Sequence, residues 1–151
     1  AKHEISVQVR AALDGKELAK SEFNTTGDLS YYPAFEVRFE PLKNVNAVLY
    51  VNYYYPACGY PSGNNLVFWL EDNQMLRVLE TSSVSDGGVF YDSEEAILPS
   101  ERGGVGDHVL VIKDQSSFEE KGNDLVRTEL TYKVTLYKWT GGKLVKEKEM
   151  K

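Results

Sequence analysis

The chain has 151 residues, of which 42% are hydrophobic and 26% are charged. These values are typical of one globular domain that buries a core without disulfides or metal, and they exclude a disordered chain, a collagen-like chain and a membrane span. The 17 Lys and Arg residues and 23 Asp and Glu residues give a net charge of −6, without a segregated basic patch. We therefore expect no nucleic-acid partner.

Period-two alternation near the N-terminus predicts a half-buried strand over residues 5–13. Asp14-Gly15 follows it as a turn signal, and we interpret residues 16–22 as the return strand of a hairpin. A second alternating stretch covers residues 34–40. There the pattern predicts one inward and one outward face, consisting of Phe35, Val37 and Phe39 and of Glu36, Arg38 and Glu40, respectively.

Residues 45–55 are almost continuously apolar and aromatic, which is typical of a central strand covered on both faces. Residues 66–70 and 75–80 flank Asp72-Asn73 and predict a further hairpin. These features place the most buried strands in the middle of the chain.

The C-terminal half begins with an irregular stretch over residues 81–107, followed by a short strand over 108–113 and a polar loop to Asp124. The longest strand is expected over 125–139, and the Gly-rich turn 140–143 leads into the last one. The whole pattern predicts an all-β fold, a single-domain antiparallel β-sandwich or open barrel of about eight or nine strands over residues 1–151.

Few residues suggest catalysis. His108 follows Asp107, but the chain has no Gly-x-Ser-x-Gly motif to supply a nucleophile. Cys58 has no basic residue in its local sequence to lower its pKa, so we interpret it as an inert packed thiol. We therefore expect no catalytic residue and no enzyme activity, with a small hydrolase built on paired carboxylates as an alternative.

Acidic residues gather in the glycine-containing stretch that follows residue 85. Its carboxylates, Asp86, Asp92 and Glu94, are candidate ligands for a cation such as calcium, which prefers oxygen donors. The alternative is a solvated acidic loop, and we expect no other cofactor.

Tyrosines are concentrated between residues 31 and 60, where seven of the ten occur. Tyrosine is a common interface anchor because it offers a large contact area and a polar tip. The candidate binding residues are Tyr31, Tyr32, Tyr54, Tyr60 and the nearby Asn64. The alternative is ordinary aromatic packing within a sheet.

These features favour a non-enzymatic, exported bacterial binding domain, such as an inhibitor or immunity-type protein that recognises a basic protein partner. A carbohydrate-binding module with a tyrosine platform is the alternative binding function. The start at Ala1 suits a mature N-terminus after removal of a leader, so we expect a periplasmic or secreted location.

Overall fold

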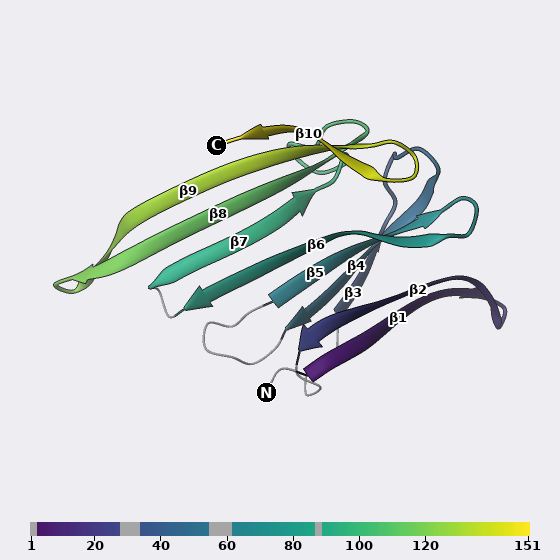
Figure 1. The fold of residues 1–151 in the computed structure, drawn as a ribbon, viewed down its shortest axis with the longest axis horizontal. Coiled ribbons are helices and arrows are strands. Elements are labelled where there is room, and N and C mark those ends of the chain that lie inside the picture. Colours follow the sequence, from purple (N-terminus) through teal and green to yellow (C-terminus); the bar gives the residue numbers. More distant parts are fainter. Residues whose placement is uncertain (1–2, 28–33, 55–61, 87–88) are drawn as a thin grey trace.

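A computed structural model of the chain describes residues 3–27, 34–54, 62–86 and 89–151. The described residues form ten strands and no helix, which confirms the all-β prediction. They are arranged as a two-stranded sheet and an eight-stranded sheet, both antiparallel (Figure 1). Within the described part of the chain, no helix is long and apolar enough to cross a membrane.

The two-stranded sheet is the predicted N-terminal hairpin, made of β1 (His3–Leu13) and β2 (Lys16–Gly27). Leu13 pairs with Lys16, so the loop has two residues. Asp14 and Gly15 both have positive φ, at 50° and 77°. This conformation matches the right-handed twist of the flanking strands, which explains why Asp-Gly predicted the hairpin.

The eight-stranded sheet is a meander in which every strand pairs with its neighbour in sequence, from β10 at one edge to β3 at the other. Its strands are β3 (Ala34–Arg38), β4 (Val45–Tyr54), β5 (Ser62–Leu70), β6 (Met75–Asp86), β7 (Phe90–Ile97), β8 (His108–Lys121), β9 (Asp124–Trp139) and β10 (Leu144–Met150). The β8–β9 hairpin extends furthest from the rest of the sheet in Figure 1.

Residues from distant strands share one core, which shows that the sheet is strongly curled. Phe68 on β5 and Trp139 on β9 meet edge to face, with ring centroids 4.9 Å apart, although β6, β7 and β8 lie between their strands. The Trp139 indole also donates a hydrogen bond of 2.8 Å to the Lys43 carbonyl between β3 and β4. The remaining buried members of this core are Leu42, Val48, Leu66, Leu70, Ala96, Leu98 and Val109.

A second core forms where the β1–β2 hairpin packs on the large sheet. Val9, Ala19 and Phe23 of the hairpin meet Leu49, Val51, Val67 and Met75 of the sheet. Strand β4 contributes to both cores, with Val48 in the first and Leu49 and Val51 in the second. The prediction that this strand is covered on both faces is therefore confirmed.

Two predictions about the C-terminal half were wrong. The stretch 81–107 contains the end of β6 and all of β7, and β8 continues through the expected polar loop as far as Lys121. These segments are mostly polar and half-buried or exposed, and ladder hydrogen bonds form there regardless of side-chain polarity. Periodicity detects a strand only where one of its faces is buried.

The orientation of the segment from Ala34 to Glu40 was also predicted wrongly. Phe35, Val37 and Phe39 are 59%, 45% and 80% exposed, whereas Glu40 is only 7% exposed. The residues that the large sheet contributes to the hairpin core belong to β4, β5 and β6, so the hairpin does not bury the apolar side chains of the edge strand β3. Alternation identifies two faces of a strand, but it does not say which of them the rest of the fold covers.

Candidate functional site

A polar cavity lies over β3 to β7 and is the candidate site. Its volume is 560 Å³, within the range of about 300–1,000 Å³ that is usual for small-molecule sites. The lining residues come from five strands and one loop: Phe35, Glu36, Arg38, Tyr50, Asn52, Asn64, Thr81, Glu94, Glu95, Ala96 and Glu101. The curl of the sheet brings together residues that are up to 66 positions apart in the sequence.

Arg38 is the central group of the cavity. Its guanidinium donates to Glu36 through Nε at 2.8 Å and to Glu101 through Nη1 at 2.5 Å. The same group lies over the Tyr50 ring, 4.5 Å from the ring centroid. The hydrogen bonds that Arg38 donates to Glu36 raise the pKa of the guanidinium above its already high ordinary value, so it keeps its positive charge. Three contacts in different directions hold this side chain in one position.

Glu101 is held rigidly by the turn in which it lies. Its second carboxylate oxygen accepts the backbone N–H of Leu98 at 2.6 Å, and its own backbone N–H donates to the Leu98 carbonyl at 3.0 Å. The neighbouring Ser100 donates twice to the buried Glu40, through its backbone N–H and its hydroxyl. These bonds fasten the loop after β7 to the segment after β3 and fix one wall of the cavity.

Two buried polar atoms on the cavity wall have no hydrogen-bond partner among the described residues, the hydroxyl of Tyr50 and Oδ1 of Asn52. Burial raises the pKa of Tyr50 well above its ordinary value, and the nearby Glu101 raises it further. The hydroxyl is therefore neutral and can both donate and accept. A buried polar atom without a hydrogen-bond partner lowers the stability of the fold, so these two atoms mark a place where a ligand could supply partners.

The charge of the cavity is predominantly negative. Four carboxylates line it, those of Glu36, Glu94, Glu95 and Glu101, against the single guanidinium of Arg38. Lys113 lies 3.5 Å from Glu94 and offsets one of the negative charges. The arrangement can accept hydrogen bonds from a donor-rich, positively charged group.

The structure brings two of the predicted site residues into this cavity, Asn64 and Glu94. Asp92 lies instead near Gln115, which donates to it at 2.8 Å. Among the described residues, no group of three or more potential ligands could hold a metal ion. Tyr31, Tyr32, Cys58 and Tyr60 lie outside the described residues, as do the side chains of Tyr54 and Asp86.

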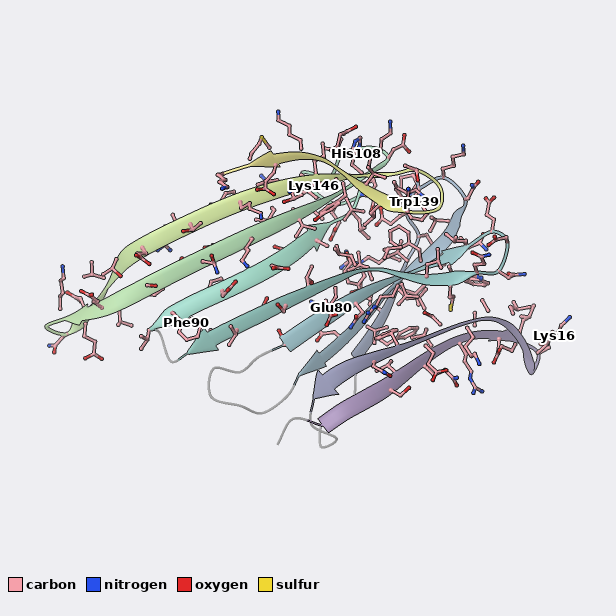
Figure 2. The ribbon with its side chains drawn as sticks, in the orientation of Figure 1. Lys16, Glu80, Phe90, His108, Trp139 and Lys146 are labelled. Atoms are coloured by element: carbon pink, nitrogen blue, oxygen red, sulfur yellow. The ribbon has the colours of Figure 1, made fainter. Side chains whose placement is uncertain are left out.

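His108 is not among the residues that line the cavity, and it lies at the end of the sheet that also carries Trp139 (Figure 2). Its Nε2 is 2.8 Å from a carboxylate oxygen of Glu147, and its Nδ1 is 2.6 Å from the Gly106 carbonyl. Neither of these partners is a serine, threonine or cysteine side chain that the imidazole could activate as a nucleophile. The contacts therefore give no support to a role for His108 in a hydrolase.

Sequence reasoning missed the residues that define the cavity, Arg38, Tyr50, Asn52 and Glu101. Arg38 was assigned to the outward face of its strand, and the loop containing Glu101 carried no motif. Comparisons of this chain with protein-family models, curated proteins and solved structures found no match. The geometry of the cavity is therefore the main guide to function.

Proposed function

We propose that this protein is a non-enzymatic binding domain that takes a cationic side chain of a basic protein partner into the polar cavity. The observation that carries the proposal is the combination of surplus carboxylates with two buried oxygens, the Tyr50 hydroxyl and Asn52 Oδ1, that have no hydrogen-bond partner among the described residues. Carboxylates only accept hydrogen bonds, and both of these unpartnered oxygens can accept them as well. A guanidinium or ammonium group supplies donors and positive charge together.

The charge of the whole chain supports the same proposal. A net charge of −6 attracts a basic partner and accelerates the encounter at low salt. An inhibitor or immunity-type protein fits this description, since such proteins bind without turnover. The periplasmic or secreted location remains part of the proposal.

The proposed carbohydrate platform has less support among the described residues. The Tyr50 ring lies under Arg38, so the guanidinium occupies the ring face on which a sugar would stack. Tyr54 and Tyr60, the other candidates for such a platform, have side chains outside the described part of the chain.

Titration with arginine amide, followed by the amide resonances of the protein, tests the proposal. We expect resonances of Arg38, Tyr50 and Asn52 to shift, and citrulline amide, which has nearly the same shape but no charge on its side chain, to shift them much less. Equal shifts with both compounds would contradict the requirement for a cationic side chain.

Glu101→Gln is the informative variant, because glutamine keeps an acceptor for Leu98 N–H while it removes the charge. We expect weaker arginine amide binding. Glu119→Gln is the matched control, since it makes the same charge change at an exposed position of β8. Equal losses in both variants would show that net charge, and not the cavity, governs binding.

A further inference from the structure

The two edges of the eight-stranded sheet differ in a way that bears on partner binding. At the β10 edge, positively and negatively charged side chains alternate from Lys146 to Glu149, and Glu149 forms ion pairs with both Lys146 and Lys133. Charged residues of this kind prevent another strand from pairing with an edge. At the β3 edge the described residues show no lysine, and the exposed side chains on one face are apolar.

Strand β3 has no sheet neighbour among the described residues on the side away from β4. Its backbone N–H and C=O groups on that side can therefore form a further antiparallel or parallel ladder. Beside it, Phe35 also lines an apolar groove of 240 Å³ together with Val7 and Val9 of β1. Among the described residues the edge is thus open, and the β1–β2 hairpin does not fill the space next to it.

The two faces of β3 differ in chemistry. Glu36 and Arg38 are on the cavity face. Phe35 and Val37 are on the opposite face with exposed fractions of 59% and 45%, and Phe35 also borders the cavity. A strand that pairs with β3 would place its own side chains alternately on these two faces. The cavity face presents surplus negative charge, and the other face presents apolar surface.

We infer that β3 is the docking edge for the partner, which adds an extended segment of alternating basic and apolar residues to the sheet. This inference rests on the proposed function and deepens it, because the basic side chains would enter the polar cavity while the apolar ones cover Phe35 and Val37. Main-chain hydrogen bonds give affinity in such complexes, and the alternate side chains give specificity.

A second copy of this chain is a poorer occupant of the same edge. The cation that β3 would offer, Arg38, is already engaged by Glu36 and Glu101 within its own chain. Two chains that each carry a net charge of −6 also repel one another. A basic segment neutralises the cavity, which a second copy of β3 does not.

The experiment measures the affinity of the protein for a short peptide of alternating valine and arginine. Three comparison peptides accompany it: one with the same residues in two blocks, one with all backbone amides methylated, and one with citrulline in place of arginine. We expect the block and methylated peptides to bind at least about tenfold more weakly, because neither can form the ladder with the correct faces.

Val37→Lys introduces the kind of charge that protects the β10 edge, at an exposed position outside both cores. We expect it to weaken binding of the alternating peptide by about tenfold. Leu130→Lys is the matched control, since Leu130 is 55% exposed and lies on the distant β8–β9 hairpin. Unfolding curves of both variants check that the fold is intact.

The possible outcomes separate the two proposals. Equal binding of the methylated and parent peptides would overturn docking at the β3 edge, and weaker binding of the citrulline peptide would still support the cavity. Equal binding of the citrulline and arginine peptides would overturn the proposed function, while sensitivity to methylation would still support the edge. Binding of none of the peptides would overturn both. A dimer that Val37→Lys dissociates would assign the edge to a second copy and overturn the inference.

Discussion

Phe68 and Trp139 contact each other across the interior with their rings inclined by 69°, although β6, β7 and β8 lie between the strands that carry them. A flat meander cannot bring these two residues together, so their contact reports the curl of the sheet. The hydrogen bond from the Trp139 indole to the Lys43 carbonyl joins the same end to the β3–β4 connection. The contact therefore closes the sheet at the end opposite the tip of the β8–β9 hairpin.

Trp139→Ala is expected to lower the free energy of unfolding by about 3–5 kcal/mol, because Trp139 is only 2% exposed and its loss leaves a large cavity. Trp139→Phe keeps an aromatic ring but leaves the Lys43 carbonyl without its donor, so a smaller loss of about 1–3 kcal/mol is expected. Urea unfolding followed by circular dichroism measures both. Equal stability of the alanine variant and the parent would contradict the closed end described above.

Gly104→Ala is expected to destabilise the wall of the cavity. A Cβ at residue 104 would lie 2.2 Å from the Leu98 carbonyl oxygen, which is backbone and cannot rotate away. We expect a loss of about 1–3 kcal/mol in the free energy of unfolding, as in other overpacked sites. Gly106→Ala is the control, because nothing lies within 4 Å of its Cβ position, and its effect should stay within about 0.5 kcal/mol. A neutral Gly104→Ala would mean that the loop after β7 is free to move.

The sequence predicted most of the strands but little of the site. Hairpins with a strong turn signal, such as the one at Asp14 and Gly15, were found because their local chemistry allows few alternatives. The cavity was missed because Arg38, Tyr50 and Glu101 meet only when the sheet curls, and no local pattern encodes that curvature. Phe35 and Val37 were assigned to the core because alternation cannot distinguish the covered face of an edge strand from the open one.

The stability of the protein is expected to depend on the protonation of His108. Both ring nitrogens face acceptors, the Gly106 carbonyl and Glu147, so only the imidazolium satisfies both. The hydrogen bond to Gly106 is the main cause that raises the pKa of His108, with Glu147 adding to it, while burial and the nearby Lys138 lower it. The folded state therefore binds the proton more tightly than the unfolded state does.

The sign of the effect follows from this raised pKa. The stabilisation is fully present below the unfolded pKa of about 6.5, and it is lost as the pH rises through the higher folded pKa. We expect a loss of at most about 1 kcal/mol, the size of an exposed ion pair. The urea midpoint of the parent should fall as the pH rises through this window. The difference between the midpoints of the parent and His108→Gln separates the contribution of His108 from that of His3. An identical pH dependence in the variant would remove His108 as the cause.

Tyr50→Phe should separate stability from binding. The Tyr50 hydroxyl is buried without a partner among the described residues, so its removal should leave the free energy of unfolding unchanged or slightly higher. If the hydroxyl bonds to the cationic side chain of the partner, the same change should weaken arginine amide binding by about tenfold, the effect of losing a hydrogen bond to a charged group. Tyr132→Phe is the control, since Tyr132 is 49% exposed on β9 and outside the cavity. A Tyr50→Phe variant that unfolds more easily and binds arginine amide normally would show that the hydroxyl stabilises the fold. The unpartnered Tyr50 hydroxyl would then no longer support a ligand site.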